Sequence, residues 1–357
     1  IGHTPAGVLS KKCFSRKFEK HFYVPPRLRD ASGELVDSVN DWHFAMINDE
    51  NRNEFYFQLL QHYIIPEKTK VIEIGAGSGI LSMMAASLGA KSVLAIEGSL
   101  DMARLARINI QKSNFAYKIK VVNAMSTDVQ IKDYPDFLPA DVLVSEMFGT
   151  LLLGESALDY ISDILSRRML TQNVVLPRFG AQYAFLIDCP HVESISSVHS
   201  YRGIDLSAIN DLRDTASVVF TKQYGFRLNS VPFKMLSKPI RIFEVDFAKD
   251  RPGFLPLIST REVVIQESGS CSAIVLFWSA YEYIEEKRFQ MSTNPEETLH
   301  NFCRDMQWGQ AIQLVEFEGA IASSSSLSSH VNAGEIIEMV QRVSHDSVLL
   351  QFGLRRL

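Results

Sequence analysis

A glycine-rich turn between an apolar run and a helical pattern constrains the fold more than any other stretch. Val71–Ile74 has the length and apolar character of a buried strand, and Gly75, Gly77 and Gly79 follow it directly. From Ile80 to Leu88 the pattern becomes helical. A strand, a glycine turn and a helix in this order present backbone amides and a helix N-terminus to a bound polar group. The sequence therefore predicts an α/β fold with a ligand at this turn.

The spacing around the turn argues against a nicotinamide cofactor and favours a ligand that contains a ribose. The dinucleotide-binding pattern requires a final glycine at the position that Ile80 occupies. The next strand-like run, Ser92–Glu97, ends in an acid 18 residues after Gly79. A carboxylate at the end of the second strand can accept hydrogen bonds from ribose hydroxyls. For the glycines, a tight turn without a ligand is the alternative.

The alternation of strands and helices continues beyond Glu97. A helical pattern covers Asp101–Lys112, and a strand-like run covers Ile119–Asn123. Met125 and Ser126 come just after that run, where an adenine ring would lie. Ligands in open α/β sheets bind beyond the carboxyl ends of the strands, so the residues that follow these strands should surround one crevice.

A fourth strand-like run, Ala140–Ser145, leads into a segment with two acids, Glu146 and Glu155, which we call the acid loop (residues 146–155). The two glutamates are nine positions apart among apolar and small residues. A helix, which turns about 100° per residue, or a strand would place them on opposite sides, so the chain must fold back to bring them together. Because unpaired buried charges are costly, the loop predicts a cation-binding site. Structural salt bridges are the alternative.

The composition of the 357-residue chain limits the class of partner and the compartment. A net charge of −5 argues against duplex nucleic acid as the main partner and favours a cationic one. Four scattered cysteines indicate free thiols in a reducing compartment, and nine histidines without close metal-ligand spacing favour chemistry without a metal. No apolar run is long enough for a bilayer and no signal peptide is evident, so we expect a soluble protein of the cytoplasm or nucleus without membrane contact.

The second half of the chain has a different pattern. Short β-type runs begin at Asn173 and recur as far as Trp278, separated by prolines and glycines. This rhythm predicts an all-β domain. We therefore divide the chain into an N-terminal extension (residues 1–37), an α/β domain (38–172) and a β domain (173–357).

Residues 191–230 interrupt the β pattern with a polar segment that leans toward helix. The segment carries Ile204, Leu206, Ile209 and Leu212. Apolar side chains gathered on a protruding segment mark interaction sites, so we expect another surface to cover them.

A helical pattern that starts at Asp41 precedes the glycine turn and carries Met46, Asp49 and Arg52. Its polar and apolar residues alternate as on an amphipathic surface helix. An ion pair of Arg52 with Asp49 or Glu50 is one interpretation. Core packing is an equally simple role for Met46.

From about residue 40 to the end, the chain closely resembles the protein arginine methyltransferases. Five segments carry the resemblance: Val71–Ser82, similar to the adenosylmethionine-binding motif; Glu97, at the position of the ribose-binding acid; Ser145–Ser156, similar to the "double-E" loop; Met306–Gln310, at the position of the Thr-His-Trp loop; and the helical segment His43–Arg52.

The resemblance implies a Rossmann-like class I methyltransferase domain followed by a barrel-like β domain. Residues 191–230 would be a helical dimerisation arm, which implies a homodimer. The implied cofactor is S-adenosyl-L-methionine, without a metal. Arg52 would pair with the carboxylate of this cofactor, and Met46 would help to shape the pocket. The other cofactor-binding positions implied are Glu73, Gly75, Gly77, Glu97, Met125 and Ser126.

The resemblance also assigns the chemistry. Glu146, Glu155, Gln307 and Trp308 would bind a substrate guanidinium, and Asp49 would face Gln307. Most of the family has a histidine at the position of Gln307, and glutamine cannot act as a base at neutral pH. The resemblance is therefore closest to the seventh-type, type III enzymes, which produce only monomethylarginine. The sequence of Leu151–Tyr160 resembles that of their single-module form in kinetoplastids.

Other activities fit parts of the sequence. A dimethylating (type I or II) enzyme and a small-molecule methyltransferase share the cofactor half, and a non-enzymatic dimeric scaffold could keep the fold. An enzyme that methylates nucleic-acid amino groups would have Asp/Asn-Pro-Pro-Tyr/Phe after the fourth strand, where this chain has Ser145–Phe148. The protein substrates that the resemblance implies are Gly/Arg-rich RNA-binding proteins and histone tails.

Overall fold

The first layer of the molecule is a parallel sheet of five strands in the order β3-β2-β1-β4-β5. The computed structural model describes residues 25–28, 33–39, 41–221, 227–298, 308–315, 317–318 and 329–357. The strands of this sheet are β1 (Lys70–Ile74), β2 (Ser92–Glu97), β3 (Ile119–Asn123), β4 (Ala140–Ser145) and β5 (Leu170–Leu176). Each neighbouring pair is parallel. The alternation predicted from sequence is confirmed for the first four strands.

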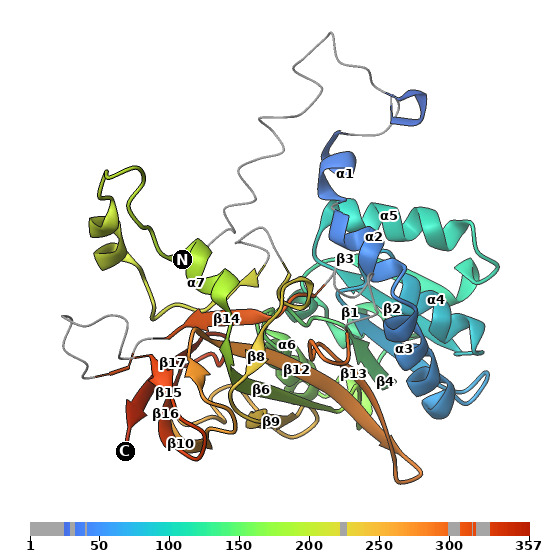
Figure 1. Cartoon of the computed structure of the whole chain (residues 1–357). Helices are drawn as coiled ribbons and strands as arrows, with labels where there is room; N and C mark the ends of the chain where they lie inside the picture. The colour runs from blue at the N-terminus through green and yellow to red at the C-terminus, as the bar shows by residue number, and fades with distance from the viewer. Residues whose placement is uncertain are drawn as a thin grey trace.

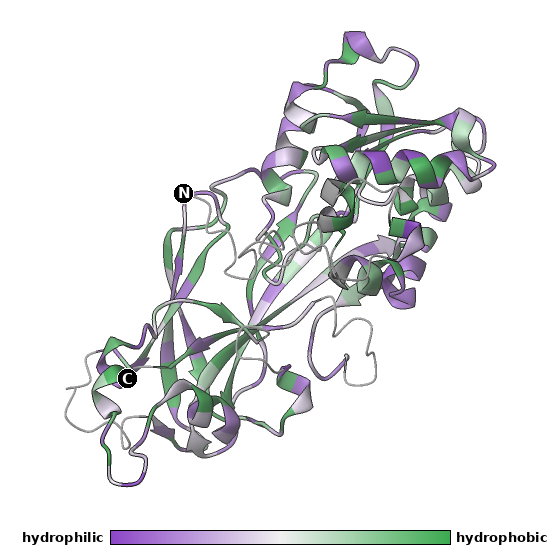
Figure 2. Cartoon of the chain, turned by 90° about the horizontal axis from the view of Figure 1, so that it is seen from above, coloured by the Kyte–Doolittle hydropathy of each residue, from purple (hydrophilic) through white to green (hydrophobic). Residues whose placement is uncertain are grey.

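Helices surround this sheet, and Figure 1 shows α2 to α5 gathered beside it. The helices of this part are α1 (Gly33–Ser38), α2 (Asp41–Ile47), α3 (Glu50–Tyr63), α4 (Ile80–Ser87), α5 (Leu100–Gln111) and α6 (Ala157–Ser166). Short 3-10 turns lie at Pro26–Leu28, Ala116–Lys118, Ser126–Asp128 and Ile131–Asp133. The Ser99 side chain caps α5 by accepting a hydrogen bond from the Met102 amide, which satisfies an otherwise unpaired donor. Several of these helices are green on one side and purple on the other, as helices packed on a sheet should be (Figure 2).

The helix expected from Asp41 onward is two helices. α2 ends at Ile47 and α3 begins at Glu50. Asp49 lies between them with an extended backbone, and its side chain accepts a hydrogen bond from the Arg52 amide. A carboxylate that caps a helix favours a new N-terminus over continuation of the preceding helix, which explains the break.

The predicted boundary between residues 172 and 173 requires a correction. The run Asn173–Leu176 was expected to open the β domain, but it is the end of β5, which pairs in parallel with β4. The expected boundary therefore falls inside a strand of the parallel sheet. β5 is an edge strand with an exposed first half, so its sequence does not show the continuous apolar run that identifies a central parallel strand.

The remaining strands are antiparallel and form the second part of the molecule. A seven-stranded sheet has the order β7-β14-β12-β6-β8, with β13 beside β12 and β9 beside β6; β10, β16 and β17 form a second sheet, and β11 and β15 a third. The strands are β6 (Phe179–Asp188), β7 (Val219–Phe220), β8 (Lys234–Met235), β9 (Ile240–Asp246), β10 (Ile258–Val264), β11 (Gly269–Ser270), β12 (Ala273–Ile284), β13 (Lys287–Ser292), β14 (Ala311–Leu314), β15 (His330–Val331), β16 (Ile336–Val343) and β17 (Leu350–Arg356).

Strands β6 and β12 separate two apolar cores. Leu186 and Trp278 belong to a large core that continues under the parallel sheet to Leu143 of β4. Phe185 and Phe277, one position away in each strand, belong to a smaller second core. Successive side chains of a strand point to opposite faces, so one sheet divides the two.

The described residues between 190 and 230 project from the second part, at the upper left of Figure 1. They contain α7 (Pro190–Ser196), a 3-10 helix at Ser207–Leu212, β7 and a 3-10 turn at Leu228–Ser230, so the predicted helical tendency is realised only in short pieces. We call this segment the arm. Ile204, Leu206, Ile209 and Leu212 of the arm are 51 to 83% exposed. No helix in the described part of the chain is long and apolar enough to cross a membrane.

Candidate active site

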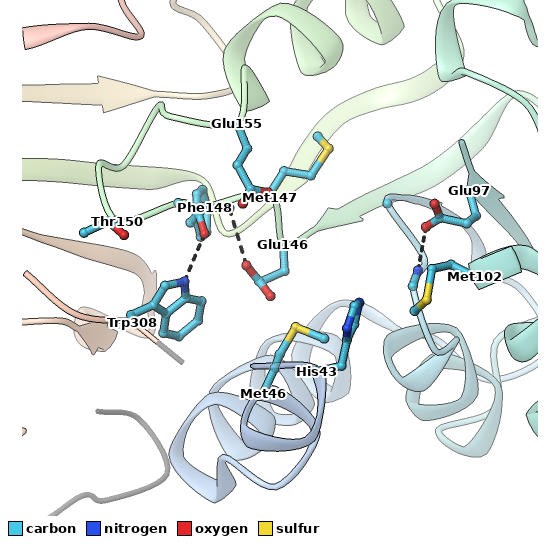
Figure 3. A pocket seen from close by; sticks show the side chains of 13 residues that line it. His43, Met46, Glu97, Met102, Glu146, Met147, Phe148, Thr150, Glu155 and Trp308 are labelled. Carbon is cyan, nitrogen blue, oxygen red and sulfur yellow. Dashed lines mark hydrogen bonds between the residues drawn. The ribbon is translucent and has the colours of Figure 1, made fainter. Parts of the chain in front are cut away.

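A cavity of about 370 Å³ opens at the carboxyl ends of β1, β2 and β4 (Figure 3). Both acid-loop glutamates line it, together with residues from the glycine turn and α2. The lining consists of His43, Met46, Gly75, Gly77, Glu97, Met102, Glu146, Met147, Phe148, Gly149, Thr150, Glu155 and Trp308. The crevice expected from the strand ends is therefore present, and it brings together residues more than 250 positions apart in the sequence.

The glycine turn and Glu97 form one wall of the cavity. Gly77 has a φ of +53°, in the left-handed region that favours glycine, and its amide donates a hydrogen bond of 2.8 Å to Glu97 Oε2. The Ser99 amide donates one of 2.7 Å to Glu97 Oε1. Each carboxylate oxygen can accept a further hydrogen bond, so Glu97 is oriented and still able to bind ligand hydroxyls.

Gly75 lets the acid loop approach the glycine turn. It has a φ of +72°, and a Cβ atom built there would lie 3.2 Å from Met147 Cγ. A side chain at this position would therefore strain the backbone and press on the acid loop next to Glu146. The glycine turn and the acid loop, on two walls of the cavity, are therefore packed against each other.

Glu73 lies behind this wall and not on it. Its carboxylate is buried and accepts a hydrogen bond from Ser82 Oγ. Burial raises the pKa of Glu73 to about 8, although the Ser82 hydrogen bond opposes the shift. Glu73, predicted to bind the cofactor, is thus bonded to α4 and does not line the cavity.

The two acid-loop glutamates differ in their electrostatic surroundings. Glu146 Oε2 accepts hydrogen bonds from Arg52 Nη2 at 2.9 Å and Arg52 Nε at 3.2 Å. Burial raises the pKa of Glu146, and Arg52 opposes that shift. Burial, and then the charge of Glu146, raise the pKa of Glu155 to about 7. In the described part of the chain no basic side chain pairs with Glu155, so it is the acid with capacity for an external cation.

Arg52 does not line the cavity. The resemblance assigns its guanidinium to a cofactor carboxylate, but here it is buried against Glu146, above the Tyr56 ring and hydrogen-bonded to Asn53. Asp49 binds the backbone amide of Arg52 and not its guanidinium. The alternative of a surface ion pair with Asp49 or Glu50 is therefore not what the structure contains.

Other predicted positions vary in their relation to the cavity. Met46 and Trp308 line it. Met125 is exposed and lies beside Gly98, because a Cβ atom built on Gly98 would be 3.0 Å from Met125 Sδ. Ser126, the next residue, is buried. Neither is part of the lining. Gln307 lies outside the described residues, so the expected pairing of Asp49 with Gln307 stays a prediction.

Sequence reasoning missed several lining residues, of which His43 and Met102 are the most informative. His43 precedes Met46 by three positions on α2, and residues three apart on a helix share a face. Met102 follows Glu97 in the first turn of α5. Both residues could therefore have been predicted from the sequence, His43 by its spacing to Met46 and Met102 by its position after Glu97. Figure 3 shows His43 and Met46 facing the acid loop across the cavity.

Among the described residues, no group of three or more His, Cys, Asp or Glu side chains is arranged to hold a metal ion. The cavity instead offers oriented carboxylates, glycine amides and thioethers, which suit a nucleoside and a cationic group.

Comparisons with known proteins agree with this chemistry. The family model of the ribosomal protein L11 methyltransferase (PrmA) matches residues 54–154. The chain is 31% identical over 226 residues to arginine N(omega)-methyltransferase of Streptomyces achromogenes subsp. streptozoticus, covering 62% of this chain and 60% of that protein. It is 26% identical over 326 residues to protein arginine N-methyltransferase 7 of Danio rerio, covering 87% of this chain and 45% of that protein. The chain is therefore similar in sequence to proteins named as arginine methyltransferases.

Solved structures of such methyltransferases share its fold. The Trypanosoma brucei PRMT1 enzyme-prozyme heterotetrameric complex with AdoHcy superposes with a TM-score of 0.70 at 19% identity, covering 89% of this chain and 93% of that chain. Protein arginine methyltransferase 10 of Arabidopsis thaliana superposes with a TM-score of 0.67. The predicted Rossmann-like domain followed by a barrel-like β part is thereby confirmed. The chain spans about half the length of the curated relatives it matches.

Proposed function

We propose that this chain transfers a methyl group from S-adenosyl-L-methionine to a guanidino nitrogen of a protein arginine and stops at ω-N-monomethylarginine. One observation carries the proposal: Glu146 and Glu155 line the same cavity as Gly77 and Glu97. A site for a cation and a site for a ribose therefore adjoin. The names of the similar proteins from Streptomyces and Danio rerio state that they methylate arginine, which supports the proposed activity.

The wall of the cavity at the glycine turn fits the cofactor. Glu97 would bind the ribose hydroxyls, while the glycine turn and Met102 would hold the rest of the nucleoside. When bound, the cofactor supplies an electrophilic methyl group on a sulfonium sulfur. Gly75 keeps this wall close to the acid loop, so the two binding sites share one enclosed space.

The acid loop would fix and activate the substrate arginine. A guanidinium is protonated at any physiological pH and is therefore a poor nucleophile. Glu155 would hold its N–H groups with charge-assisted hydrogen bonds, with Glu146 completing the site beside Arg52. Much of the acceleration would come from this positioning. With a pKa of about 7, Glu155 is also suited to accept the proton that the guanidinium loses.

The restriction to monomethylation rests on resemblance. Several relatives carry the name protein arginine N-methyltransferase 7, and Gln307 replaces the histidine found in most of the wider family. Without that histidine, the two glutamates would work alone.

Methylation of free arginine is a second candidate. The Streptomyces relative is named for arginine and not for protein arginine, and it aligns over 62% of this chain. The two candidates need the same cation site and differ only in the substrate that presents the guanidinium.

One incubation separates these readings. The chain is mixed with labelled S-adenosyl-L-methionine and either a Gly/Arg-rich peptide or free L-arginine, and the products are resolved by amino-acid analysis. We expect labelled ω-N-monomethylarginine in the peptide. Dimethylarginine would refute the type III assignment, label only in free arginine would favour the second candidate, and no label in either would refute arginine methylation.

We further propose that the chain acts as a homodimer through the arm on Gly/Arg-rich RNA-binding proteins and histone tails. The exposed apolar residues of the arm support the dimer, since they would otherwise stay in water.

A further inference from the structure

The backbone of the acid loop is held by side chains of the antiparallel part. The indole Nε1 of Trp278 on β12 donates a hydrogen bond of 2.8 Å to the Gly149 carbonyl. Gln182 Oε1 on β6 accepts one of 3.0 Å from the Leu152 amide. Gly149 and Leu152 both lie between the two glutamates of the loop.

Trp278 and Gln182 form one buried patch of sheet. They are directly opposite each other in the antiparallel pairing of β12 with β6, and both are 0% exposed. Gln182 Nε2 donates a hydrogen bond of 2.8 Å to the Phe277 carbonyl, so its amide cannot turn away from the loop. The Trp278 amide donates to Thr293 Oγ1 at 3.0 Å, which fixes β12 at this residue.

The loop is also fitted to the shape of this patch. Phe148 packs on the Trp278 ring at a centroid distance of 5.4 Å. Leu152 lies over Gly180 of β6, where an added Cβ would be 2.8 Å from Leu152 Cδ2. A side chain at position 180 would therefore displace Leu152. Gly180 is two residues from Gln182 and on the same face of β6.

An apolar core would not need these polar atoms. Phenylalanine at position 278 and leucine at position 182 would fill most of the same space, whereas a buried indole N–H or amide must find partners to avoid a cost. The partners here are backbone groups of the loop that carries both acids. A planar guanidinium requires carboxylates at defined separations, so the position of this backbone bears directly on its binding.

We propose that Trp278 and Gln182 are positioning residues that set the arrangement of Glu146 and Glu155 for the substrate guanidinium. This inference rests on the proposed arginine methylation. It also gives the antiparallel part a role in the active site beyond Trp308, because side chains of β6 and β12 hold the backbone of the acid loop in position.

The test compares Trp278→Phe and Gln182→Leu with the unmodified chain. Each variant removes one hydrogen bond to the loop and retains most of the side-chain volume. For a Gly/Arg-rich peptide, we expect kcat/KM to fall about 10- to 100-fold, with a raised peptide KM. Affinity for S-adenosylhomocysteine, measured by calorimetry, should change by less than about twofold, because the glycine turn and Glu97 are untouched.

Phe185→Leu is the matched control. Phe185 is buried on the opposite face of β6, in the second core, so this change loosens the same strand without touching the loop. We expect it to lower the thermal stability while leaving the peptide KM unchanged. Equal kinetic losses in Phe185→Leu and Trp278→Phe would show that general destabilisation, and not loop position, is responsible.

A second measurement does not depend on catalysis. Amide hydrogen exchange of residues 147–154 should accelerate in Trp278→Phe and Gln182→Leu and not in Phe185→Leu. Unchanged exchange and unchanged KM in both loop variants would overturn the positioning role. Failure of the unmodified chain to methylate any arginine would instead refute the proposed function, and it would leave the exchange result to decide how the loop is held.

Discussion

At the scale of single residues, the two acid-loop glutamates are chemically unequal. Glu146 has a buried counter-ion in Arg52, whereas Glu155 has a pKa near 7 and no basic partner among the described side chains. A site with two equivalent acids would bind a cation symmetrically. Here one acid is already engaged, so the second determines how strongly an added guanidinium is held.

The raised pKa of Glu155 predicts a pH dependence of activity. The carboxyl must lose its proton to hold a guanidinium, and it is protonated below its pKa of about 7. We therefore expect kcat/KM for a peptide substrate to fall as the pH drops below about 7, approaching tenfold per pH unit. Initial rates between pH 5.5 and 9 measure this.

Glu155→Gln serves as the companion variant. It should abolish transfer at every pH and leave S-adenosylhomocysteine affinity nearly intact, since the Gly77 and Ser99 amides, and not Glu155, orient Glu97. Turnover by this variant, detected by mass spectrometry of the peptide, would contradict the role of Glu155.

Because Arg52 and Glu146 form a buried ion pair, we expect substitutions of the two residues to have non-additive effects on the free energy of unfolding. Arg52→Met leaves Glu146 as an uncompensated buried carboxylate, which costs about 3–5 kcal/mol in comparable pairs. Denaturant unfolding measures this loss. Adding Glu146→Gln should restore part of the stability, because the neutral amide no longer needs a cation. Purely additive single-variant effects would argue against the pair.

At the scale of elements, the break between α2 and α3 shapes one side of the site. α2 presents His43 and Met46 to the cavity, while α3 begins at Glu50 and carries Arg52 toward Glu146. Asp49 sets the change in direction by capping α3. In one continuous helix, His43, Met46 and Arg52 would be arranged around a single axis. Such a helix could not both present His43 and Met46 to the cavity and carry Arg52 to Glu146.

The cap predicts different effects for two substitutions of Asp49. Asp49→Ala should destabilise the protein by about 1 kcal/mol, because the Arg52 amide loses its acceptor. Asp49→Asn retains a capping oxygen and should keep stability close to that of the unmodified chain. Thermal unfolding distinguishes them. If Asp49→Asn keeps stability but loses activity, Asp49 has a catalytic role in addition to its capping role.

At the scale of the whole molecule, two parts are joined through one continuous core and share one cavity. The core continues from Leu143 of the parallel sheet to Trp278 of β12, next to the acid loop. The arm extends away from this body (Figure 1), and its apolar residues Ile204, Leu206, Ile209 and Leu212 are exposed.

The exposed arm predicts the oligomeric state. Replacing Leu206 and Leu212 with aspartate should convert a dimer to monomers, since a charge cannot be buried in an apolar interface without a partner. Light scattering after size-exclusion chromatography measures the mass. A mass for the unmodified chain equal to its 40.2 kDa monomer would rule out the dimer.

The sequence by itself determined the parallel strands β1 to β4 and the glycine turn. It also determined that Glu97 ends a strand at the ligand crevice and that Glu146 and Glu155 belong to one site. These follow from local patterns, because apolar runs, glycines and strand-terminal acids act within a few residues of one another. It also indicated Met46 and Trp308 through resemblance. The sequence misplaced β5, whose exposed edge position removes the apolar signature of a central parallel strand.

Only the tertiary structure decided which partners the buried polar groups found. Arg52 and Glu146 are 94 positions apart, and Trp278 and Gly149 are 129 apart, so no local pattern connects them. Burial gave Glu155 its pKa, and burial depends on the whole fold. The acids were visible in the chain, but their unequal roles arise from side chains that the fold brings to them.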